Sequence, residues 1–103
     1  MKPPELSDEQ RSEALARAAE ARRVRAETKE LLKTGTLSFA ELLDRADEDE
    51  FIAGIKVATL LAAMPGTGKV KAKRLMEKHE IADNRRIRGL GDRQRAALLA
   101  EFS

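Results

Sequence analysis

The positions of the apolar residues predict a chain built of helices. The clearest stripe lies between residues 51 and 64 and follows the i, i+3, i+4, i+7 spacing of a helix with one buried side. Its members are Val57, Leu60, Leu61 and Met64. We expect this helix to begin near Lys56, after a turn at Gly54, and to be the most buried element of the chain.

A long helix is predicted ahead of this stripe, over residues 8–33. Ser7 and Gln10 have the spacing of a capping box, and Gly35 stands where helices often end. The first half is rich in alanine, which favours helix but buries little area. We therefore expect that half to project from the rest of the protein, after a frayed, extended lead-in over residues 1–5.

A second capping box opens a shorter helix. Ser38 and Glu41 form the box, and Leu37 and Leu42 have the spacing of a hydrophobic staple across the same helix start. The signals at this helix start therefore agree, and we expect the helix to run to about Ala46.

A turn of sequence Pro-Gly-Thr-Gly joins the apolar helix to a lysine-rich helix predicted over residues 69–80. Gly66 and Gly68 permit backbone angles that other residues rarely adopt. The start of the second helix offers unpaired N–H groups and the positive end of a dipole, which together bind anions. The nearby lysines indicate that the anion is a phosphate. The residues predicted to form this site are Pro65, Gly66, Thr67, Gly68, Lys69, Val70, Lys71 and Lys73.

Composition limits the classes of function. The 103 residues, 42% of them hydrophobic, make one small domain. Three phenylalanines without tryptophan or tyrosine argue against an aromatic platform for single strands. The absence of cysteine excludes disulfides and thiolate metal sites, and we predict no metal and no cofactor. No apolar run of about 18 residues and no apolar signal core are present, so we expect no membrane partner and a cytoplasmic location.

The net charge of +2 hides an uneven distribution. Residues 36–64 hold two Lys/Arg and six Asp/Glu, whereas residues 65–95 hold ten and four. Four of the acidic residues form a run at 47–50, which lacks the alternating ligands and the glycine of a calcium loop. We interpret this run as a solvated linker. The distribution predicts one surface that faces a polyanion and one that is turned away from it.

A second basic cluster follows the lysine-rich helix. Arg85, Arg86 and Arg88 lie in a glycine-bounded connection, and Arg93 lies near the start of a last helix predicted over residues 92–102. Arginine pairs bidentately with phosphate and can enter a narrow minor groove. Closely spaced arginines repel one another unless a bound anion neutralises their charge. We therefore expect these arginines to point outward and bind phosphate. The alternative is a solvated basic loop.

A third basic set lies on the long helix. Arg22, Arg25 and Lys29 share a narrow sector of the helix surface with Arg11 and Lys33. A solvated face and an auxiliary phosphate contact both fit this pattern, and the pattern alone does not decide between them.

No enzymatic chemistry is indicated. The Gly68–Lys69 pair suggests a nucleotide-binding phosphate loop, but that motif needs glycine where Ala63 stands and Ser or Thr where Val70 stands. His79, the single histidine, lies on or beside an apolar stripe and is interpreted as structural. Because we find no pair of nucleophile and base, we interpret the protein as a non-enzyme.

The hairpin resembles known nucleic-acid-binding modules. Its pattern, Pro65-Gly66-x-Gly68 followed by Ala72 and Leu75, is similar to that of helix-hairpin-helix and helix–two-turns–helix proteins. The resemblance implies that main-chain amides grip phosphates without reading bases. Thr67 departs from the pattern, because these modules usually carry an apolar residue there.

Essentially the whole chain resembles the integration host factor family of actinobacteria. The similarity runs from Leu6-Ser7-Asp8-Glu9-Gln10-Arg11, through Ala21-Arg22-Arg23, to residues 85–95. It implies an all-α fold, with a lead-in and long helix over residues 1–36 and a helix–two-turns–helix DNA-binding domain over residues 37–103, the two forming one structural unit.

The same resemblance implies a nucleoid-associated protein that binds double-stranded DNA with little sequence preference and bends, constrains or bridges it. It further implies a role in site-specific recombination and chromosome organisation, with a topoisomerase or recombinase as partner, and we expect a monomer. The alternative is an RNA-binding structural protein of the ribosomal helix–two-turns–helix type. The lack of a long basic tail after Phe102-Ser103 disfavours that alternative.

Overall fold

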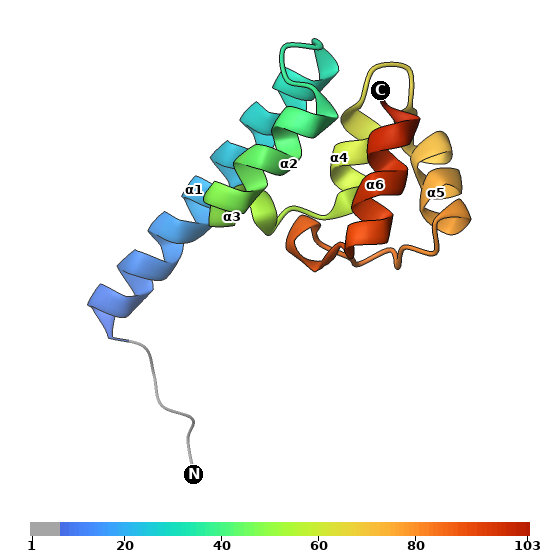
Figure 1. Cartoon of the computed structure of the whole chain (residues 1–103). Coiled ribbons are helices and arrows are strands. Elements are labelled where there is room, and N and C mark those ends of the chain that lie inside the picture. Colours follow the sequence, from blue (N-terminus) through green and yellow to red (C-terminus); the bar gives the residue numbers. More distant parts are fainter. Residues whose placement is uncertain (1–6) are drawn as a thin grey trace.

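The computed structural model describes residues 7–103, and within them the fold is all-helical, as predicted (Figure 1). The lead-in predicted over residues 1–5 lies outside the described residues. The helices are α1 (Asp8–Lys33), α2 (Phe39–Glu48), α3 (Glu50–Ala53), α4 (Val57–Ala63), α5 (Gly68–Lys78), the 3-10 turn η1 (Ile87–Gly89) and α6 (Asp92–Glu101).

The long helix α1 has the predicted ends. Ser7 and Gln10 form the capping box through backbone-to-side-chain hydrogen bonds of 3.0 and 3.1 Å, and Gly35 follows the helix with a φ of +76°. Only Thr28 and Leu32 of α1 are buried, while Leu15 is 65% exposed. The N-terminal half therefore extends beyond the other helices, as expected (Figure 1).

The second capping box is also confirmed, at Ser38 and Glu41. The hydrogen bond that the Ser38 backbone N–H donates to the Glu41 carboxylate lowers the pKa of Glu41. Leu37 and Leu42 are both buried at this helix start, in agreement with the predicted staple.

The acidic run at 47–50 is largely exposed, as expected, but the interpretation of it as a linker is wrong. Its first two residues complete α2, and the carboxylate of Asp49 caps α3 by accepting hydrogen bonds from the N–H groups of Phe51 and Ile52. Glu50 then pairs with Arg17 of α1 at 2.8 Å. The physical reason is that carboxylates satisfy and stabilise helix N-termini, so a dense acidic run can start a helix.

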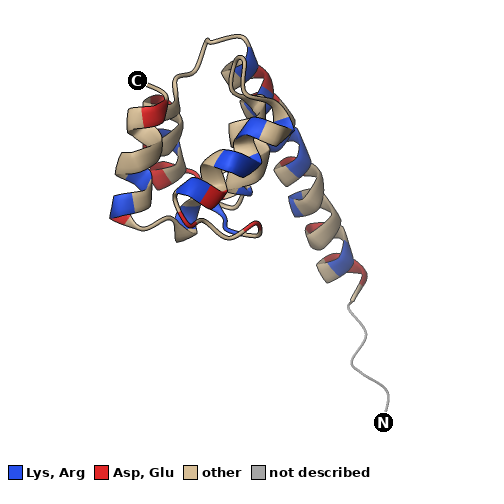
Figure 2. Cartoon of the chain, turned by 90° about the vertical axis from the view of Figure 1, so that its right-hand side faces the viewer, with Lys and Arg blue, Asp and Glu red and all other residues tan. Residues whose placement is uncertain are grey.

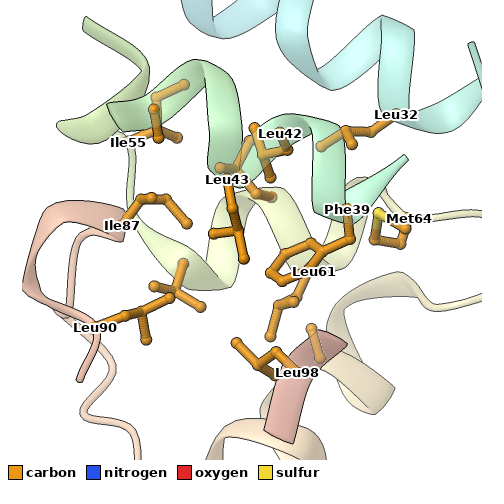
Figure 3. Packing of buried hydrophobic residues seen from close by; sticks show 14 of the residues in the cluster. Leu32, Phe39, Leu42, Leu43, Ile55, Leu61, Met64, Ile87, Leu90 and Leu98 are labelled. Carbon is orange, nitrogen blue, oxygen red and sulfur yellow. The ribbon is translucent and has the colours of Figure 1, made fainter. Parts of the chain in front are cut away.

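One hydrophobic core joins all the helices (Figure 3). α4 lies at its centre, since Val57, Leu60 and Leu61 are fully buried, which confirms the expectation that this element is the most buried. α5 packs along α4 and brings Ala72, Leu75 and Met76 into the core. The C-terminal helix α6 contributes Leu98, and half-buried Leu99 and Phe102 pack beside it.

Candidate nucleic-acid interface

The hairpin between α4 and α5 has the backbone that its two glycines predict. Gly66 and Gly68 adopt φ angles of +73° and +68°, and the N–H of Thr67 donates to the carbonyl of Met64 at 3.1 Å. A Cβ atom at either glycine would meet nothing within 4 Å. The glycines are therefore required by the turn conformation, and the backbone around them is open to a ligand.

Thr67 takes the place of the apolar residue usual in such hairpins without leaving the core. It is only 9% exposed, and it stands at the N-cap of α5 without forming a side-chain cap there. Within residues 7–103, α1, α2 and α3 have side-chain caps at their N-termini. The first-turn amides of α5 thus lack an acceptor from the N-cap side chain, which suits the binding of an external anion.

The basic residues of α5 are exposed, and helical periodicity places them on more than one face. Figure 2 colours the positions of all Lys and Arg residues along the ribbon. Lys69 and Lys73 are four positions apart and line the same shallow groove against α4, whereas Lys71 lies on the opposite side of the helix because of helical periodicity. The side chain of Val70, which lies between Lys69 and Lys71 in the sequence, is 68% exposed. The structure therefore brings Lys69 and Lys73 together and separates Lys71 from them.

A wide groove of about 1290 Å³ lies beside the hairpin, between it and the C-terminal part of α1. Lys29 and Lys33 of α1 line this groove together with Lys69 of α5. Arg25 and Arg22 are exposed about one and two turns farther along α1. Of the three α1 residues singled out from the sequence, Lys29 is thus the one that borders the hairpin groove.

Two side chains of the arginine connection donate hydrogen bonds to backbone carbonyls, one within the connection and one in the segment before α4. Arg85 donates to the carbonyl of Gly89 at 2.7 Å, and Arg86 donates to the carbonyl of Gly54. Arg86 is exposed, as expected, and Arg85 is half-buried, but both side chains also donate hydrogen bonds to the backbone, which the sequence did not indicate. Glycine carbonyls fix their guanidinium groups, each of which retains further N–H donors. Arg88 is exposed.

The same connection pairs with the segment that leads into α4. Val57 donates its N–H to the Arg85 carbonyl at 2.9 Å, and Ile87 donates to the Ile55 carbonyl at 3.0 Å, so that Lys56 and Arg86 form an antiparallel bridge. Lys56 is exposed and was not among the site residues expected from the sequence. A contact across 30 positions leaves no local signal by which it could be found.

Arg93 lies in a different setting. It lines a cavity of about 270 Å³ with Lys78 and His79 at the end of α5. His79 Nε2 lies 3.0 Å from Glu101 Oε1, and Lys78 Nζ lies 2.7 Å from the same oxygen. Hydrogen bonds from Lys78 and His79 lower the pKa of Glu101. His79 therefore joins α5 to α6, in keeping with its interpretation as a structural residue. In residues 7–103 no group of acidic or histidine side chains is arranged to hold a metal ion.

The hairpin and the arginine connection lie at opposite ends of α4. Lys56, bridged to Arg86, is the N-cap of α4, whereas Met64 is its C-cap and begins the hairpin. In Figure 1 the hairpin is accordingly at the top of α4 and η1 is near the bottom of α6. We refer to residues 65–73 as the hairpin surface and to Arg85, Arg86 and Arg88 as the arginine surface.

Comparison with known proteins defines the class. Residues 32–102 match the family described as the S13-like H2TH domain, so the compact helical part is a helix–two-turns–helix domain. Over 99 residues the chain is 54% identical to "Integration host factor" of Mycobacterium tuberculosis, covering 96% of this chain and 94% of that protein. It is 48% identical over 99 residues to "Integration host factor" of Streptomyces coelicolor, covering 96% and 92%. The chain belongs to the integration host factor family of Mycobacterium and Streptomyces.

A solved structure is similar over most of the chain. "Structure of sIHF bound to an 8bp palindromic DNA" matches with a TM-score of 0.82 and 45% sequence identity, covering 85% of this chain and 99% of that chain. Among the described residues, no helix is both long and apolar enough to span a membrane.

Proposed function

We propose that this protein is a nucleoid-associated architectural protein that binds double-stranded DNA with little sequence preference and bends, constrains or bridges it. The observation that carries the proposal is the presence of two cationic surfaces at opposite ends of one buried helix, α4. The similar protein sIHF bound to DNA supports duplex DNA as the ligand.

The hairpin surface would hold one stretch of phosphates. The amides of the first turn of α5 and the positive end of its dipole face the anion, and Lys69, Lys71 and Lys73 supply charge from both sides of the helix. Lys29, and beyond it Arg25 and Arg22, would extend this footprint along α1. None of these contacts needs a base edge, so phosphate contacts of this kind fix position without reading sequence.

The arginine surface would hold a second stretch of phosphates. Arg85 and Arg86 are held in place by glycine carbonyls, which lowers the entropy lost when their remaining donors bind phosphate. Arg93, in its separate cavity, would act as a peripheral contact. With two surfaces on one monomer, one protein can hold two duplexes or two segments of a bent duplex.

The proposal extends to the setting in which the protein acts. We place it in the nucleoid, in the cytoplasm, as a non-enzymatic monomer that supports recombination and DNA topology, with a topoisomerase or recombinase as partner. The division into residues 1–36 and 37–103 remains a prediction.

The first test is a titration of duplex DNA, structured RNA and single-stranded DNA at several salt concentrations. We expect the duplex to bind most tightly, with log K falling against log salt by about 0.9 per phosphate contacted. A flat salt response would contradict phosphate binding. Preference for structured RNA would favour the ribosomal type of function instead.

The second test separates the two surfaces. Changing Arg85, Arg86 and Arg88 to Ala, or Lys69, Lys71 and Lys73 to Ala, removes three charges from one surface at a time. We expect each triple variant to bind one duplex more weakly and to lose the capture of a second, labelled duplex by an immobilised one. Circular dichroism checks the fold, and the matched Arg-to-Lys triple keeps the charge. Capture that survives in both triple variants would contradict the two-surface proposal.

A further inference from the structure

The bridge between Lys56 and Arg86 places a fourth cation on the arginine surface. The two flanking hydrogen bonds, Val57 N–H to Arg85 O and Ile87 N–H to Ile55 O, enclose the pair. Residues placed this way form a non-hydrogen-bonded antiparallel pair, in which the two side chains emerge on the same side and lie closest together. Lys56 and Arg86 are therefore cross-strand neighbours whose side chains leave the backbone on the same side, although 30 positions separate them in the sequence.

Like charges directly opposite each other destabilise a strand pair. Lys56 is exposed, and within the described residues it belongs to none of the ion pairs that hold the helices together. It makes no side-chain cap for α4 either. Two like-charged residues thus stand opposite each other here, and within residues 7–103 no carboxylate forms an ion pair with Lys56.

The Arg86 member of the pair is held in place by a neighbouring backbone segment. Arg86 donates to the carbonyl of Gly54, and a Cβ atom on Gly54 would lie 3.2 Å from Nη1 of Arg88. Both guanidinium groups are therefore gathered over the short segment that runs from Gly54 into α4, of which Lys56 is the last residue. The segment thus presents cations from two distant parts of the chain at one place.

We propose that Lys56 is a phosphate-binding residue of the arginine surface, and that a backbone phosphate of duplex DNA binds to Lys56 and Arg86 together and neutralises their charge. The inference rests on the proposed function and deepens it, because it assigns a residue outside the arginine connection to the second DNA contact. It also predicts opposite effects of one substitution. Removing the lysine relieves the repulsion in the free protein and weakens the complex.

The experiment compares Lys56→Gln, Lys56→Arg and the control Arg45→Gln in the full chain. Arg45 is an exposed residue of α2, and its change to Gln alters the net charge by the same amount. Affinity for a duplex is measured at several salt concentrations, and the melting temperature of the free protein is measured in parallel.

We expect Lys56→Gln to weaken duplex binding roughly threefold to tenfold and to reduce the salt slope by about 0.9. Its melting temperature should equal or exceed that of the wild type. Lys56→Arg should restore affinity and slope, and Arg45→Gln should leave both near wild type. If Lys56→Gln keeps the wild-type slope, or changes it no more than Arg45→Gln does, the inference is overturned.

The outcomes also separate this inference from the proposed function. A wild-type protein that does not bind duplex DNA overturns both. A wild-type protein that binds, and whose arginine triple variant binds weakly while Lys56→Gln binds normally, overturns only the role of Lys56.

Discussion

Asp47 and Arg95 form a two-pronged ion pair between α2 and α6, with hydrogen bonds of 3.1 and 3.2 Å to the two carboxylate oxygens of Asp47. The hydrogen bonds from Arg95 lower the pKa of Asp47, and those to Asp47 raise the pKa of Arg95. Arg95 is thus engaged within the protein, although it lies in the most basic part of the sequence. The acidic partner comes from the run of carboxylates at 47–50.

This pair predicts a pH dependence of stability. Because the pKa of Asp47 in the folded protein lies below its ordinary value of 3.8, the pair stabilises the fold above that value and the contribution is lost as pH falls through the folded pKa. We expect Asp47→Asn to lower the melting temperature at neutral pH, with the difference from wild type shrinking in acid. Thermal unfolding followed by circular dichroism measures this, and Glu48→Gln is the neighbouring control. A difference that stays constant with pH would show that the pair is not the cause.

The hairpin glycines predict a loss of both stability and binding. Gly66→Ala and Gly68→Ala each place a Cβ atom on a residue with positive φ, at a cost of about 1 kcal/mol. Gly35→Ala is the matched control, since Gly35 has a φ of +76° and open space around it but lies at the end of α1. We expect all three variants to lose similar stability in urea unfolding, and only the hairpin variants to bind duplex DNA more weakly. Equal loss of binding in Gly35→Ala would mean that strain alone explains the effect.

The basic stripe of α1 predicts a gradient of effects along the helix. Lys29 lines the groove beside the hairpin, while Arg25, Arg22 and Arg11 lie progressively farther away. Single changes to Gln should therefore weaken duplex binding most at Lys29 and least at Arg11, as measured by titration at low salt. If all four variants lose affinity equally, the stripe acts through its overall charge and not through contacts near the hairpin. If all four keep the wild-type affinity, the stripe is a solvated face.

The core predicts a sharp contrast between two leucines. Leu61 of α4 is fully buried and Leu15 of α1 is 65% exposed. Leu61→Ala should destabilise the fold by about 2–5 kcal/mol, whereas Leu15→Ala should change stability by no more than about 0.5 kcal/mol. Urea unfolding measures both. A large loss at Leu15 would indicate that the projecting half of α1 packs against something in solution.

The features predicted well from the sequence are those that depend on residues within about five positions of each other. Ser7 with Gln10, and Ser38 with Glu41, define helix starts because both partners of each hydrogen bond lie in one turn. The hairpin turn was likewise predictable from Gly66 and Gly68. The burial of the Thr67 side chain was not predictable in this way, because it depends on how α4 and α5 pack against each other.

The features that sequence reasoning missed join distant segments. The ion pair between Asp47 and Arg95 shows that the acidic run is part of a contact between α2 and α6. The bridge between Lys56 and Arg86 places Lys56 beside the arginine surface. A charged side chain looks the same in sequence whether it meets solvent, a carboxylate or a glycine carbonyl. The roles of the individual surface residues in DNA binding therefore remain predictions.

The length of α4 fixes the path of any duplex that touches both surfaces. Its seven residues, none of them charged, span roughly 10 Å between Lys56 and the hairpin. One inserted residue would rotate one end of α4 relative to the other by about 100°, and it would move the buried leucines of α4 by the same angle. A duplex leaving the hairpin would then approach the arginines from another direction. If both surfaces bind one duplex, as proposed, the shape of that duplex depends on the residue count of an apolar helix.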